Sequence, residues 1–257
     1  MNAKRALLVL TALSLGVLAV LSLDWRSENR IEKITVTGNY TISKEEILRY
    51  AHISDTAANP TEAGIDMIQS RISKHPEIKN VYVNIIHPSE LKIEIVEKRP
   101  VAIISGENEM FLLDDGLDVF PFRNFTKLYD LPVISGIRKE VNPKSSNKFN
   151  TEDLRTALFI ILSSYKESKV LYNNISEIRM SDQEKIIVYL SEDSTPIYFP
   201  RYNDKKIADS EYQEVLLKKL RIFKNYINQS LADHLKEKTN YVDMRFDNQI
   251  IVNSNNQ

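Results

Sequence analysis

The chain has 257 residues, and its 34 Lys and Arg against 35 Asp and Glu give a net charge of −1. This balance excludes the broad basic field of a nucleic-acid-binding protein. The chain contains no cysteine, which excludes disulfide bonds, thiolate chemistry and Cys-ligated metals. Its length allows one large or two small domains, which must be held together by packing alone.

An apolar segment at residues 6–23 contains no charged side chain. As a helix it would be about 27 Å long, enough to cross the hydrocarbon core of a bilayer. Lys4 and Arg5 precede it, and the residues that follow carry no positive excess. The positive-inside rule therefore predicts a cytoplasmic stub at 1–5, a transmembrane helix at 6–23 and export of everything after it.

A cleaved signal peptide is the alternative for this segment, because it shares the basic start. Such peptides usually have a shorter apolar core and end in an Ala-x-Ala-like site, and residues 19–24 offer no convincing one. The pattern favours a retained anchor.

Residues 31–98 begin with a predicted strand at 31–39, which ends in a Gly-Asn pair suited to a tight turn. Ser43 and Glu46 form a capping box that opens the next helix. A second helix is predicted at 64–74, where isoleucines recur at spacings of three and four.

Two alternating runs at 81–85 and 91–95 follow, separated by a short link that contains Pro88. Their period of two predicts a hairpin with one buried face, since proline makes the link a turn. The resulting order is strand, helix, helix, strand, strand, which is enough for one small core with two helices on one face of a sheet.

From residue 100 a second domain of mixed α/β structure is predicted, with a predominantly antiparallel sheet and two main helices. Asp114, Asp115 and Gly116 indicate a hairpin turn, because Asp-Gly tolerates positive φ angles. Thr151 can cap one helix, and an apolar stripe predicts the other at about 209–227. The remaining strands are predicted at 175–180, 186–190, 197–199, 241–246 and 250–252.

A search for catalytic motifs finds little. The four histidines lack the spacing of a metal site, there is no Gly-x-Ser-x-Gly, and six glycines form no phosphate-binding loop. Asp114 and Asp115 lie beside a glycine and are typical turn formers. The sequence therefore predicts a protein that is not an enzyme and uses no metal, cofactor or small-molecule substrate.

Several segments together resemble the FtsQ/DivIB family of bitopic cell-division proteins. They are VTGNYTISKEEIL, HPEIKNVYVNIIHPSELKIEIVEKRPVA, the turn at Asp114, LPVISG and the terminal YVDMRFDNQIIV, in the order seen in that family. The first two also resemble any POTRA domain, whereas YVDMRFDNQ separates FtsQ from a generic POTRA protein. The resemblance implies an α+β chain with a POTRA domain at 31–98, an FtsQ-type β domain at 100–253 and a disordered tail at 254–257.

The resemblance also implies a function. A family member is a single-pass inner-membrane protein of the division septum, with its C-terminal domains in the periplasm. It binds FtsB, and through it FtsL, together with other membrane proteins of the divisome, and helps to position septal peptidoglycan synthesis. FtsB adds a strand at a C-terminal sheet edge. Carried over by position, the expected partner-binding residues are Arg245, Phe246, Asp247, Asn248, Gln249, Ile250 and Ile251.

For Arg245 an ion pair inside the domain is an equal alternative to a partner contact. The chain departs from the family pattern in its very short N-terminal stub and in Phe199-Pro200-Arg201, which stand where many relatives have Leu-Gly after the strand near 199. Two other functions stay open: a POTRA-bearing chaperone or secretion factor that binds by strand addition, and a membrane-anchored cell-wall hydrolase.

Overall fold

The structure is a computed structural model. It describes residues 11, 13–17, 31–53, 62–86, 89–123, 128–139, 149–202, 204–233, 239–247 and 249–254. The chain divides into two compact units, Met1–Lys98 and Arg99–Gln257, and each is described by itself.

Most of the predicted transmembrane helix lies outside the described residues, which include only 11 and 13–17 of the segment 6–23. Within the described part of the chain, no helix has both the length and the apolar character needed to span a bilayer.

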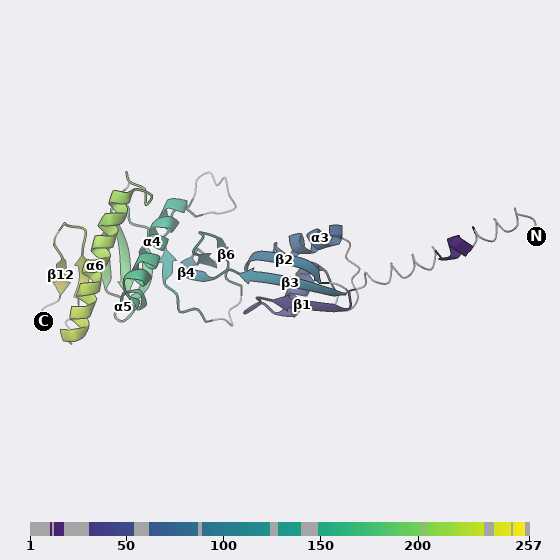
Figure 1. The fold of residues 1–257 in the computed structure, drawn as a ribbon. Coiled ribbons are helices and arrows are strands. Elements are labelled where there is room, and N and C mark those ends of the chain that lie inside the picture. Colours follow the sequence, from purple (N-terminus) through teal and green to yellow (C-terminus); the bar gives the residue numbers. More distant parts are fainter. Residues whose placement is uncertain are drawn as a thin grey trace, which may run out of the picture. The chain divides into compact units, whose positions relative to one another are not determined.

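The first unit confirms the predicted β-α-α-β-β order (Figure 1). Its three strands form a sheet in the order β1-β3-β2, in which β3 pairs parallel with β1 and antiparallel with β2. The core lies between this sheet and the two helices, where isoleucine, leucine and valine side chains are buried. The elements are β1 (Lys33–Thr37), α2 (Lys44–Ala51), α3 (Glu62–Ile72), β2 (Ile78–Ile86) and β3 (Glu90–Glu97).

The turn between β1 and α2 is held by two residues. Gly38 has a φ of 80°, and a Cβ at this position would lie 2.0 Å from the carbonyl oxygen of Ile95, so only glycine fits. The carboxylate of Glu97 accepts hydrogen bonds from the backbone N–H groups of Tyr40, Thr41 and Ile42, each at 2.9 Å. Ser43 caps α2 as predicted, since its Oγ accepts from the N–H of Glu46 at 3.2 Å.

The second unit is one mixed sheet with helices α4, α5 and α6 against it (Figure 1). The strand order is β12-β11-β10-β9-β8-β7-β4-β5-β6, and among the described residues five of the eight pairings are antiparallel and three are parallel. The elements are β4 (Pro100–Ser105), β5 (Met110–Asp114), β6 (Val119–Pro121), β7 (Val133–Ser135), α4 (Thr151–Glu167), α5 (Lys169–Asn173), β8 (Ile175–Arg179), β9 (Lys185–Leu190), β10 (Pro196–Pro200), α6 (Ser210–Asp233), β11 (Thr239–Asp243) and β12 (Ile251–Ser254).

The core of this unit lies between the helices and one face of the sheet. Phe199 on β10 and Phe223 on α6 are both fully buried, and their rings meet edge to face with centroids 5.7 Å apart. Helix α6 is also the crossover that joins β10 to its parallel neighbour β11. The position of β11 and β12 at one end of the sheet therefore depends on how α6 packs.

Several local predictions are corrected. The N-cap of α4 is Asn150, not Thr151, because the Asn150 side chain accepts from the N–H of Asp153. In the β5–β6 turn the positive φ falls on Leu117 rather than on Gly116, since the carboxylate of Asp114 accepts from the N–H groups of Gly116 and Asp118 and sets the turn.

Other differences concern strands. The strand predicted at 241–246 ends at Asp243, whose carboxylate accepts from the N–H of Arg245 and turns the chain. Ser254, predicted as the start of the tail, is the last residue of β12 and lies opposite Thr239, whereas 255–257 lie outside the described residues. Strands β4 and β7 and the short helix α5 carried no element prediction from their sequence pattern.

Candidate partner-binding edge

The sheet of the second unit ends at β12, which has one neighbouring strand, β11, in the part of the chain that the structure describes. The pairing runs from Asp243 opposite Ile251 to Thr239 opposite Ser254. A strand with a single neighbour leaves one row of backbone N–H and C=O groups without ladder partners. The opposite end of the sheet is the three-residue strand β6, which closes with Pro121. Proline and shortness both disfavour strand addition there.

Apolar side chains are exposed at β12 and in the turn before it. Phe246 is 47% exposed, Ile250 40%, Ile251 42% and Val252 47%. Neighbouring residues of a strand point to opposite faces, so the exposure of both Ile251 and Val252 means that neither face of β12 is covered. The four side chains, Phe246, Ile250, Ile251 and Val252, are called the β12 patch below.

The structure describes six of the seven predicted residues and places them in three settings. Arg245, Phe246 and Asp247 belong to the turn after β11, Gln249 and Ile250 are exposed residues before β12, and Ile251 is its first residue. Asn248 lies outside the described residues. Val252, which sequence reasoning omitted, belongs to the same exposed group. Its signal was the apolar run Ile250-Ile251-Val252, which continues one residue beyond the predicted site.

Arg245 is engaged inside the domain. Its Nε and Nη2 atoms donate to the two carboxylate oxygens of Asp243 at 3.0 and 2.7 Å, and the Asp243 side chain is 7% exposed. Burial by itself would raise the pKa of Asp243, but the hydrogen bonds and charge of Arg245 hold that pKa below its usual range. Arg245 therefore fixes the end of β11, which is the alternative that the sequence left open.

Lys219 on α6 contacts the same turn from the core side. Its side chain is 1% exposed, and its Nζ donates to the backbone carbonyl of Phe246 at 2.5 Å. Burial lowers the pKa of Lys219, and the nearby carboxylate of Asp247 acts in the opposite direction. Sequence reasoning missed this residue. The signal was its position three residues after Leu216 and four before Phe223, which places a charged residue within the apolar stripe of the helix.

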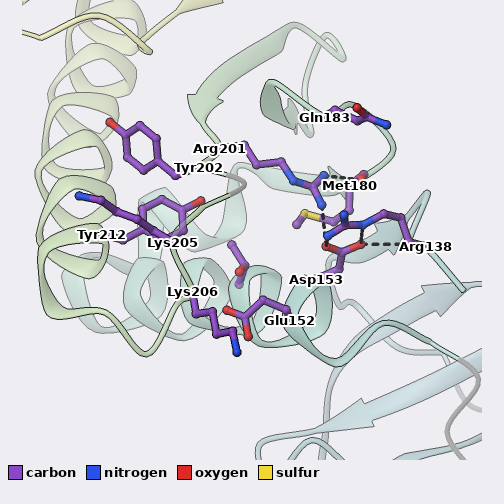
Figure 2. Close-up of a pocket in the computed structure, with 11 residues that line it drawn as sticks. Arg138, Glu152, Asp153, Met180, Gln183, Arg201, Tyr202, Lys205, Lys206 and Tyr212 are labelled. Carbon is purple, nitrogen blue, oxygen red and sulfur yellow. Dashed lines mark hydrogen bonds and ion pairs between the residues drawn. The ribbon is translucent and has the colours of Figure 1, made fainter. Parts of the chain in front are cut away.

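A separate polar pocket of about 450 Å³ lies beside the start of α4. Figure 2 shows Asp153 between Arg138 and Arg201. Arg201 is 6% exposed and also donates to the carbonyls of Met180 and Asp182 at 2.5 and 2.7 Å. The carboxylate, the two guanidinium groups and the two carbonyls are one another's hydrogen-bond partners, so the arrangement is an ion network that joins α4 to the end of β10. Arg201 is one of the residues at which the sequence departs from the family pattern.

No group of three or more metal-ligating side chains occurs among the described residues. Buried Tyr212 lines the same pocket, and its hydroxyl donates to the carbonyl of Pro200 at 3.3 Å. Burial raises the pKa of Tyr212 to about 12, so this phenol stays protonated at neutral pH. In this pocket it acts as a structural hydrogen-bond donor.

Comparison with known proteins gives consistent matches for both units. The family model described as "POTRA domain, FtsQ-type" matches residues 29–98, and the one described as "Cell division protein FtsQ/DivIB, C-terminal" matches residues 102–245. The second match ends at Arg245, so the whole β12 patch lies beyond it.

Similar curated proteins carry the name "Cell division protein FtsQ". The chain is 27% identical to that of Syntrophotalea carbinolica over 68% of this chain and 62% of the relative. It is 26% identical to that of Myxococcus fulvus over 63% of this chain and 56% of the relative. The match therefore covers less than two thirds of either relative. With the protein of Koribacter versatilis the identity is 27% over 97% of this chain and 70% of the relative. On the strength of the two family models, this chain belongs to the FtsQ/DivIB family of cell-division proteins.

Proposed function

We propose that this protein is a non-enzymatic scaffold of the divisome, which binds FtsB by strand addition at β12 and, through FtsB, FtsL. In this role it helps to position septal peptidoglycan synthesis. It is held in the inner membrane by a single helix at 6–23, with the N-terminus in the cytoplasm and both described units in the periplasm. The residues proposed to contact the partner are Arg245, Phe246, Asp247, Asn248, Gln249, Ile250 and Ile251, and we add Val252 because it is exposed on the same strand.

One observation carries the proposal: among the described strands, the outermost one has a single neighbour, and it exposes apolar side chains on both of its faces. An edge that a protein does not use is normally protected by proline, charge or a covering segment. The four residues of β12, Ile-Val-Asn-Ser, contain neither proline nor charge. An added strand would pair with the open backbone groups and cover the β12 patch at the same time.

Side chains contribute to this contact on the same scale as the ladder bonds do. Each main-chain hydrogen bond gives a net of about 0.5–1.5 kcal/mol. Full burial of one large apolar side chain is worth about 1.5–3 kcal/mol, so side chains that are already half covered gain about 0.75–1.5 kcal/mol each. Across the four side chains of the β12 patch the gain is roughly 3–6 kcal/mol before the cost of association.

The test uses proline at the two adjacent positions Ile251 and Val252. Successive N–H groups of a strand point in opposite directions, so one of the two prolines removes a bond to β11 and the other removes only an N–H of the open edge. The proline variant that removes only an N–H of the open edge should keep the wild-type melting temperature and lose co-purification with FtsB. Val252→Thr is the matched control, because it keeps both the N–H and the β-branched shape.

A side-chain variant gives an independent answer. Phe246→Ala removes a half-exposed ring and should weaken FtsB capture by about tenfold while the melting temperature stays unchanged. If Phe246→Ala and a folded proline variant both capture FtsB as well as the wild-type protein does, the docking site is refuted. The membrane topology is tested separately, by attaching a reporter that is active only in the periplasm after residue 257 and before residue 6.

A further inference from the structure

We propose that Lys219 is a positioning residue for the docking edge: from inside the domain, its ammonium holds the carbonyl of Phe246 and so fixes the turn that presents β12. This inference rests on the proposed function, because it concerns the same edge. Lys219 itself is too deeply buried to contact a partner.

Lys219 is 1% exposed and ranks with Phe199 and Phe223 among the most deeply buried large side chains of the described residues. Burying an ammonium carries a large desolvation cost, and a simple core position would be filled by leucine or methionine. A lysine here is therefore explained by what its Nζ binds, the Phe246 carbonyl at 2.5 Å.

Phe246 lies in the turn that connects β11 to the edge strand, three residues after β11 ends at Asp243 and five before β12 begins at Ile251. The beginning of the turn is held by the N–H of Met244, which donates to the carbonyl of Tyr198 at 3.0 Å, and by the pairing of Arg245 with Asp243. Lys219 supplies the next attachment at Phe246, two residues after Met244 and one after Arg245.

The Phe246 side chain is 47% exposed while its carbonyl is bonded inward, so one residue joins the core to the β12 patch. A charge-assisted hydrogen bond to this carbonyl restricts the backbone of the turn before the partner arrives. Ordering the turn in advance lowers the entropy cost of docking, so loss of the ammonium should weaken binding without removing any direct contact.

The experiment uses the full chain in detergent and measures two quantities: affinity for the FtsB protein of the same organism, and hydrogen–deuterium exchange of the turn amides. Lys219→Met keeps an unbranched side chain of similar length and removes the charge. We expect exchange at residues 246–251 to accelerate and the dissociation constant for FtsB to rise by about tenfold. The melting temperature should not fall, because the variant also removes a buried charge.

Lys224→Met is the matched control. It lies on the same helix, and its Nζ pairs with Glu167 at 2.7 Å, away from the turn. It should leave both readouts at their wild-type values. A rescue variant is Lys219→Cys, which would be the only cysteine of the chain. Alkylation with 2-bromoethylamine before refolding restores an ammonium at nearly the original reach and should recover affinity and slow exchange.

The outcomes separate this inference from the proposed function. Failure of the wild-type protein to bind FtsB overturns the proposed function. Wild-type binding together with unchanged turn exchange in Lys219→Met overturns the positioning role alone. The same conclusion follows if exchange accelerates while the affinity of that variant stays within twofold of wild type, or if the alkylated cysteine variant does not recover.

Discussion

Removal of the carboxylate charge at Asp153 is the sharpest test of how the second unit is held together. The side chain is 2% exposed, and one of its oxygens accepts from Arg138 and from Arg201, each at 2.6 Å. Its other oxygen accepts from the Nε and the backbone N–H of Arg138 at 3.0 and 3.2 Å. Asp153→Asn keeps the shape of the side chain but leaves the Arg201 guanidinium buried without its counter-charge (Figure 2).

The size of the effect follows from the difference between the two arginines. Arg138 is 51% exposed and can be rehydrated, so its pair contributes under about 1 kcal/mol. Arg201 is 6% exposed and cannot be rehydrated. Removing one partner of such a buried ion pair costs about 3–5 kcal/mol. For a unit of this size each kcal/mol lowers the melting temperature by about 2–4 °C, so Asp153→Asn should lower it by roughly 6–20 °C.

The assay is urea unfolding, monitored by hydrogen–deuterium exchange in peptides from α4 and β9. These peptides report on the second unit separately from the first. Glu167→Gln is the control, because its partner Lys224 is 31% exposed and can be rehydrated, so the loss should stay under about 1 kcal/mol. In the double variant with Arg201→Met, both charges are removed and much of the stability should return. A loss under 1 kcal/mol for Asp153→Asn, or no recovery in the double variant, would refute the reasoning.

Two further predictions concern the first unit. Gly38→Ala forces a Cβ to 2.0 Å from the Ile95 carbonyl at a φ of 80°, so unfolding should become easier by more than about 1–2 kcal/mol, measured by urea denaturation; wild-type stability would contradict the turn geometry. Glu97→Gln should cost about 1–2 kcal/mol at pH 7, because the side chain loses the charge that accepts the turn N–H groups. Burial opposes the shift, but hydrogen bonds from Thr41 and its neighbours lower the folded pKa of Glu97. The stabilisation is therefore present above the unfolded value of about 4.3 and is lost as the pH falls through the folded pKa. The difference between wild type and Glu97→Gln should shrink toward pH 3, and a difference independent of pH would count against it.

Local sequence patterns determined much of the first unit. The alternation at 81–85 and 91–95 and the Ser43 cap depend on neighbours within a few residues, and the hairpin and the α2 cap form as predicted. The same holds for strands β8, β9 and β10 and for helices α4 and α6. The family resemblance, which rests on the order of short motifs along the chain, is confirmed by the two family models.

Only the tertiary structure decided which charged residues are buried and what they bind. Asp153 and Arg201 are far apart in the sequence, as are Lys219 and Phe246, and a lysine in a helix normally reads as solvent-facing. The crossover through α6 sets β11 beside β10 and leaves β12 with one neighbour in the part of the chain that the structure describes, a property of the whole sheet rather than of the four residues of β12. Periodicity determines which side chains share a face of an element, but tertiary packing determines which elements meet. Whether a sheet edge is left open depends on that packing alone.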